Sequence, residues 1–169
     1  MRRRSFLALG ITGTAALAAA GWWFALRGPA RGSRVLDDEA VAVVSAIVPA
    51  VLDGALPPSG HERQAALAAA VDAVCRAIEE LQPTARGEIA QLFALLALPL
   101  ARRAFAGVAP PWPEASIAEI TAFLDRWRDS GWALKRSAYD ALHQLIFAAW
   151  YGDQRSWRAI GYPGPPQLA

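Results

Sequence analysis

Apolar residues recur every three or four positions along most of this chain, and that spacing restricts the fold more than any other feature of the sequence. Such a repeat places the apolar side chains on one face of a helix. No stretch shows the sustained two-residue alternation that is typical of a half-buried strand. The sequence therefore predicts an all-α protein, in which about five helices pack as an irregular bundle.

Acidic residues and prolines mark the ends of the first helices. Asp37 is expected to cap a helix over 40–52, which is apolar on nearly every side and should be interrupted or kinked at Pro49. A second helix should start near Glu62 and end at Pro83. Its expected inward stripe consists of Leu67, Val71, Val74, Ile78 and Leu81.

Three further helices follow from the same signals. A helix over 84–105 contains Pro99, which predicts a kink or break near Leu98 because proline lacks an N–H and disfavours helical backbone before it. Ser116 with Glu119 forms a capping box at the start of the fourth helix. The expected core faces of the last two helices are Ile117, Ile120, Leu124 and Trp127, followed by Leu134, Ala138, Leu142, Leu145 and Ala149 on a helix over 133–150.

Residues 1–26 differ from the rest of the chain in charge and composition. A cationic start precedes an uncharged stretch up to Leu26, and Ala18-Ala19-Ala20 offers a cleavage site, an order that is typical of a secretory signal. The paired arginines, followed after one residue by Phe-Leu, are similar to a twin-arginine (Tat) export signal. The residues that carry this similarity are Arg3, Arg4, Phe6 and Leu7.

The same segment is long enough to anchor the protein in a membrane. Ser5 to Leu26 spans 22 residues, and about 20 apolar residues cross a bilayer. Trp22 and Trp23 suit the headgroup region. The residues leave a cleaved signal and an uncleaved anchor in the inner membrane both open. Either way, the rest of the chain is expected in the periplasm.

Composition divides the chain into four parts. After the signal or anchor over 1–26, residues 27–36 are rich in Gly, Pro and Arg and are interpreted as a linker. Residues 37–151 form the predicted helical bundle. Residues 152–169 form an expected extended tail that is rich in proline and aromatic residues.

Charge is divided in a similar way. Six of the 17 Lys and Arg residues precede Val35, whereas all 15 Asp and Glu residues follow it, so the chain from Val35 onward carries 11 basic and 15 acidic residues. The charge-dense run 125–129 is expected to be a solvated helix face with Trp127 pointing inward. A nucleic-acid interface needs basic residues clustered on the domain itself, and we therefore expect no nucleic-acid partner.

Few side chains of this sequence suit catalysis or metal binding. His61 and His143 lack the spacing of a metal motif and are expected at the surface or capped. Cys75, the single cysteine, is expected to be a small buried residue, with a disulfide to a partner chain as the alternative. Arg102 and Arg103 are expected to be exposed. Because no nucleotide, haem or phosphate motif is present, no catalytic, cofactor-binding or metal-binding residue is assigned.

The tail carries the most specific pattern in the chain. Trp150-Tyr151-Gly152 is followed after four residues by Trp157-Arg158-Ala159-Ile160-Gly161-Tyr162-Pro163-Gly164. Together with the twin-arginine leader and Ile47-Val48-Pro49 in the first helix, this ending resembles the small subunit of periplasmic flavin-dependent sugar and alcohol dehydrogenases, the gluconate 2-dehydrogenase subunit 3 type.

This resemblance implies a non-catalytic accessory subunit. It implies an escort for a large flavoprotein of the glucose-methanol-choline (GMC) class, which would hold the FAD and cross the Tat translocon together with the small subunit. A cytochrome c subunit often takes the electrons in such complexes. No cofactor is expected in this chain. The residues expected to bind the partner are Trp157, Ile160, Tyr162 and Pro163.

The residues leave other interpretations open. The main alternative is a free-standing helical protein, Tat-exported or membrane-anchored, with a structural or binding role in the cell envelope. A small enzyme with an unrecognised site is a third. The residues from Trp157 to Pro166 could likewise fold back over the bundle or dock on the partner.

Overall fold

A computed structural model describes residues 35–157 and 162–164, which contain helices and no strand, and the expected all-α fold is confirmed for these residues. The leader residues Arg3, Arg4, Phe6 and Leu7, and Ile160 of the tail, lie outside the described residues. The elements are α2 (Asp38–Val51), α3 (Gly60–Glu80), α4 (Pro83–Ala97), α5 (Pro99–Ala101), the π-helical turn η1 (Arg102–Ala106), the 3-10 turn η2 (Trp112–Glu114), α6 (Ile117–Arg128), α7 (Ala133–Tyr151) and α8 (Gln154–Trp157).

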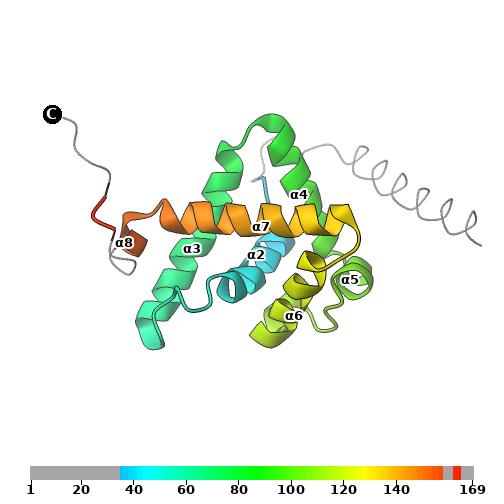
Figure 1. The fold of residues 1–169 in the computed structure, drawn as a ribbon, viewed down its shortest axis with the longest axis horizontal. Coiled ribbons are helices and arrows are strands. Elements are labelled where there is room, and N and C mark those ends of the chain that lie inside the picture. The colour runs from blue at the N-terminus through cyan, green and yellow to red at the C-terminus, as the bar shows by residue number, and fades with distance from the viewer. Residues whose placement is uncertain (1–34, 158–161, 165–169) are drawn as a thin grey trace, which may run out of the picture. The chain divides into compact units, whose positions relative to one another are not determined.

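Helix α2 is the centre of the bundle and packs against α3, α4, α6 and α7, with α7 crossing over it in Figure 1. The Asp37 carboxylate accepts the N–H of Ala40 at 2.8 Å, so the predicted cap is confirmed. The predicted interruption at Pro49 is wrong: the helix continues through it to Val51, because a proline in the last turn removes a single backbone hydrogen bond. The buried residues of α2 are Ala40, Val43, Val44, Ile47, Val48 and Val51.

Pro99 breaks the third helix, as predicted. Helix α4 ends at Ala97, and the axis turns by 79° before the segment Pro99–Ala106. Leu98 between them has the extended backbone that a residue before proline prefers. Gly107 ends the second segment in the left-handed region, at φ +70°. A Cβ at this glycine would lie 2.8 Å from the Arg126 guanidinium.

In the first turns of α6 and α7, residues that were predicted to face the core are exposed. The capping box is confirmed, because the Ser116 hydroxyl accepts the Glu119 N–H and the Glu119 carboxylate accepts the Ser116 N–H. Ile117 is 46% exposed and Leu134 is 60% exposed, so both predictions were wrong. Apolar spacing indicates a helix face, but not how far the neighbouring helices extend along it. The buried residues are Ile120, Phe123, Leu124 and Trp127 of α6, and Leu142 and Ile146 of α7.

Arg102 is a second correction. Its side chain is buried, with 7% exposure, whereas Arg103 is exposed as expected. The Arg102 Nη2 donates to the Ala109 carbonyl at 3.3 Å, and its Nε has no hydrogen-bond partner. The turn of the chain at Pro99 directs Arg102 and Ala106 inward together, which the linear sequence did not indicate.

Over residues 35–157 and 162–164, no single helix has both the length and the apolar composition to cross a bilayer. The pair Pro83–Ala97 and Pro99–Ala106 does so only when it is taken together, across its bend.

Candidate functional site

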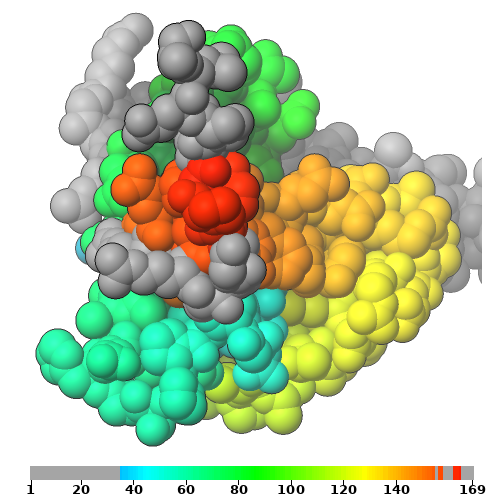
Figure 2. All heavy atoms as spheres, turned by 60° about the vertical axis from the view of Figure 1, so that its left-hand side comes forward, coloured from blue at the N-terminus to red at the C-terminus, as the bar shows by residue number. Residues whose placement is uncertain are grey.

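The tail residues that the structure describes form a small aromatic unit at the end of α7. The Trp157 indole N–H donates to the Tyr151 carbonyl at 2.7 Å, and the Tyr162 N–H donates to the Trp157 carbonyl at 2.9 Å. The rings of Trp157 and Tyr162 meet edge to face, with centroids 5.2 Å apart. Figure 2 shows residues 162–164, in red, lying against the orange end of α7 and α8. We call Trp157, Tyr162, Pro163 and Gly164 the tail unit.

The end of the tail unit depends on a glycine. Gly164 has φ +100°, a backbone conformation that favours glycine. A Cβ at this position would lie 3.2 Å from the Trp157 ring. Both the backbone conformation and the close approach to the indole therefore disfavour a side chain at Gly164.

Part of the tail is helical, which corrects the expectation of an extended segment from residue 152. Gln154–Trp157 forms one helical turn, α8. The Ser156 backbone N–H and hydroxyl both donate to the Asp153 carbonyl, at 3.0 and 2.8 Å, and Ser156 is buried. This turn is built by local hydrogen bonds rather than by apolar spacing, so periodicity could not predict it.

The tail unit is not part of the main core, and Trp150 is the last residue of α7 that packs against that core. Trp157 is half-buried, whereas Tyr162 is 45% exposed and Pro163 is exposed. The structure therefore brings together three of the four residues expected to bind a partner. Docking of these residues on another chain stays a prediction.

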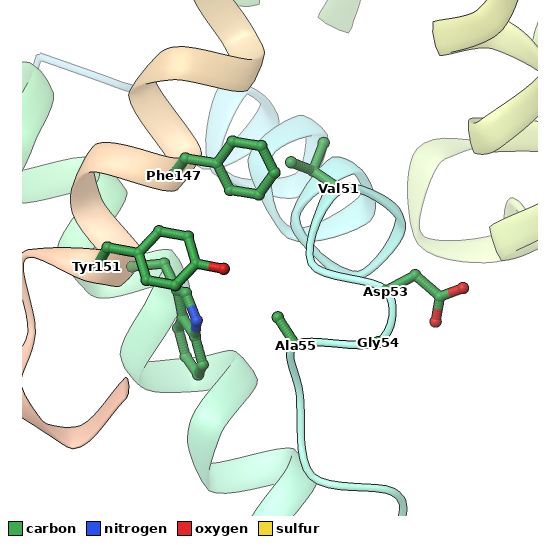
Figure 3. Close-up of a pocket in the computed structure, with 7 residues that line it drawn as sticks. Val51, Asp53, Gly54, Ala55, Phe147 and Tyr151 are labelled. Carbon is green, nitrogen blue, oxygen red and sulfur yellow. The ribbon is translucent and has the colours of Figure 1, made fainter. Parts of the chain in front are cut away.

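Next to the tail unit, a cavity of about 340 Å³ lies at the C-terminal ends of α2 and α7. Figure 3 shows the Phe147 ring near Val51, and the Tyr151 hydroxyl directed towards the turn that contains Gly54. The Asp53 carboxylate points away from these rings. The residues that line the cavity are Val51, Asp53, Gly54, Ala55, Phe147, Trp150 and Tyr151.

An aromatic row on α7 leads to the cavity. Tyr139, His143, Phe147 and Tyr151 follow one another at four-residue intervals, with successive ring centroids 4.8, 4.7 and 5.9 Å apart. Burial lowers the pKa of His143, against an opposing effect of the Asp140 carboxylate. The row was missed from the sequence, although aromatic residues at a constant spacing of four on one helix are a signal that could have revealed it.

The remaining candidate side chains lie apart from this region. Cys75 of α3 is half-buried and packs against the core, and its disulfide to a partner chain stays a prediction. His61 is exposed in the first turn of α3. Among the residues that the structure describes, no group of three or more His, Cys, Asp or Glu side chains is arranged to hold a metal ion.

The charge-dense run 125–129 has the predicted arrangement. Trp127 is buried, and its indole N–H donates to the Phe105 carbonyl at 3.1 Å. Arg128 is exposed and pairs with Asp125 at 2.9 Å and Asp129 at 3.1 Å. The hydrogen bond from Arg128 lowers the pKa of Asp129. These charges belong to a solvated helix face.

Comparison with known proteins gives no family assignment. The chain matches no family model, no curated protein and no solved structure.

Proposed function

We propose that this chain is the non-catalytic small subunit of a periplasmic, membrane-associated, flavin-dependent sugar or alcohol dehydrogenase. In this proposal it escorts a large FAD-binding subunit through the Tat translocon and remains bound to it. The observation that carries the proposal is the ending Trp150-Tyr151-Gly152 with Trp157 to Gly164. Its residue order is the most specific part of the resemblance to this type of subunit.

The geometry of the tail unit supports a role in binding. Tyr162 is 45% exposed, although its ring packs on Trp157. Tyr and Trp are enriched among the residues that dominate protein interfaces. The hydrogen bond to the Tyr151 carbonyl and the close packing at Gly164 already order the unit before any partner arrives. Such order lowers the entropy lost on binding.

The leader supports the second part of the proposal. Arg3 and Arg4 with Phe6 and Leu7 match the twin-arginine pattern. The Tat route moves proteins that have already folded in the cytoplasm. A large subunit with its FAD in place would therefore be able to cross with this chain as one complex.

The experiment changes the leader and the tail separately in the source cells and measures dye reduction by the flavoprotein in periplasmic and cytoplasmic fractions. Arg3→Lys with Arg4→Lys should leave the dehydrogenase activity in the cytoplasm, because the translocon needs both arginines. Arg2→Lys is the matched control, since it leaves the pair intact. Activity that still reaches the periplasm with both arginines replaced would contradict the escort role.

Changing the tail tests the complex itself. Tyr162→Ala should reduce the flavoprotein that co-purifies with the chain, because it removes the exposed ring of the tail unit. Trp132→Ala is the control, because Trp132 is 66% exposed but lies between α6 and α7. If the unchanged chain purifies from membranes with no flavoprotein, the free-standing envelope protein becomes the better interpretation.

A further inference from the structure

The cavity at the ends of α2 and α7 has a chemistry that the proposed function does not use. Phe147, Trp150 and Tyr151 supply three aromatic side chains to its lining, and the turn Asp53–Ala55 supplies backbone. Aromatic rings attract cations to their faces through the ring quadrupole, and the attraction grows when the cation loses water. A cavity with this lining favours an organic cation over an anion.

Two helix ends add negative potential at the same place. Val51 is the last residue of α2 and Tyr151 the last of α7, and both line the cavity. A helix C-terminus carries partial negative charge, which Lys or Arg in the last turn commonly offsets. Neither α2 nor α7 has a basic residue in its last turn.

Among the residues that the structure describes, the hydrogen bonds at the end of α7 come from neutral donors. The backbone N–H of Gly152 donates to the Ala148 carbonyl, and that of Asp153 donates to the Trp150 carbonyl. The Tyr151 carbonyl accepts the indole N–H of Trp157. These bonds satisfy carbonyl oxygens, but they bring no positive charge to the helix end.

Asp53 contributes a full negative charge at the rim. It is exposed, and its carboxylate is directed away from the rings of Phe147 and Tyr151 (Figure 3), so it acts on the approach of a ligand rather than as a contact inside the cavity. No described Lys or Arg side chain is among the lining residues. The aromatic side chains, the two helix ends and the carboxylate therefore favour the same kind of occupant.

We propose that this cavity binds an arginine side chain of the partner chain. A guanidinium is planar, holds water more weakly than an ammonium and stacks on aromatic rings, so it suits this lining better than lysine. Its N–H groups can donate to the Tyr151 hydroxyl, which points into the cavity. Tyr151 also joins the cavity to the tail unit through its carbonyl, so one partner surface can contact both. The identity of the partner rests on the proposed function, whereas the preference for a cation does not.

Two matched peptides test this proposal on the full chain in mild detergent. Acetyl-Gly-Arg-Gly-amide and the same peptide with citrulline, the uncharged analogue of arginine, are titrated while NMR follows the amides of residues 53–55 and the Trp150 indole N–H. The arginine peptide should bind at least about tenfold more tightly, and added salt should reduce the difference. Equal affinities, or no binding of the arginine peptide at about 10 mM, would overturn the proposal.

Variants locate the binding. Tyr151→Leu should weaken the arginine peptide about three- to tenfold by removing one ring. Asp53→Asn changes the charge of an exposed side chain and should weaken it about two- to fivefold. Asp140→Asn removes another exposed carboxylate, one that does not line the cavity, and should leave the affinity unchanged. Equal weakening by Asp140→Asn would show that net charge alone attracts the peptide, and the site would be rejected.

A titration with a small free cation tests whether the cavity prefers an arginine side chain. Tetramethylammonium should bind more weakly than the arginine peptide, because it cannot donate hydrogen bonds to Tyr151. If it binds as tightly, the cavity serves free small cations and the partner-arginine proposal fails. The titrations need no flavoprotein, so their failure leaves the escort role standing, and failure of the export experiment leaves the cation site standing.

Discussion

Two helix carboxyl ends, that of η1 near the start of α7 and that of α7 itself, differ in the hydrogen-bond donors that their carbonyls accept. Near the start of α7, the Lys135 Nζ and the Trp127 indole donate to the Phe105 carbonyl at 3.3 and 3.1 Å. Arg126 donates to the next carbonyl, that of Ala106, at 2.9 Å. At its finish, the carbonyls of α7 accept only neutral donors among the hydrogen bonds described above, and no basic residue occupies the last turn.

This difference separates a structural role from a binding role. The carboxyl end of η1 is closed by two cations and a buried indole of the chain itself, so its negative potential is already offset. The ends of α2 and α7 line a cavity, and neither has a basic residue in its last turn or among the lining residues that the structure describes. We therefore expect changes around the carboxyl end of η1 to alter the free energy of unfolding, and changes at the ends of α2 and α7 to alter ligand binding.

The largest effect is expected at Trp127. Its ring packs edge to face against Phe105 and Phe123 and is 1% exposed. Trp127→Ala should lower the free energy of unfolding by about 3 to 5 kcal/mol, because it leaves a cavity in the core. Thermal melting measures the loss. Trp132 is exposed, so Trp132→Ala should lower the free energy of unfolding by no more than about 1 kcal/mol. Equal losses for the two variants would show that burial of the Trp127 ring does not stabilise the region around the end of η1.

A change at Gly107, directly after η1, tests the backbone of the same region. Gly107→Ala should cost about 1 to 2 kcal/mol, because its φ of +70° strains a residue with a Cβ. The added Cβ would also displace the Arg126 guanidinium, 2.8 Å away. Gly87 lies inside α4, and a Cβ there has no atom within 4 Å, so Gly87→Ala should raise stability by about 0.5 to 1 kcal/mol. The opposite signs, read from melting curves, are the prediction. Two changes of the same sign would refute it.

The smallest effect is expected from adding a positive charge to the carboxyl end of α7, as the end of η1 already has. Ala148 is exposed in the last turn of α7, and Ala148→Lys should raise stability by about 0.3 to 1 kcal/mol by offsetting the helix end. It should also weaken the arginine peptide. Ala148→Gln, of similar length but uncharged, should do neither. Unchanged peptide affinity with lysine in place would mean that the end of α7 contributes no potential to the cavity.

Local chemistry explains what could be predicted. The Asp37 cap, the Ser116–Glu119 capping box and the break at Pro99 each involve residues that are neighbours along the chain. The inward position of Trp127 followed from apolar spacing. The predictions for Leu134 and Arg102 failed, because the exposure of Leu134 depends on how far the neighbouring helices extend, and the burial of Arg102 depends on the turn of the chain at Pro99.

The sequence by itself determined the helical class, most helix boundaries, and the leader and tail patterns on which the proposed function rests. Only the tertiary structure decided that Val51 and Tyr151, 100 positions apart, end their helices at one cavity, and that Trp157 closes the end of α7. A helix cap depends on residues three or four apart, which the sequence displays directly. The meeting of two helix ends depends on the lengths and crossing of every helix between them, and packing alone sets these.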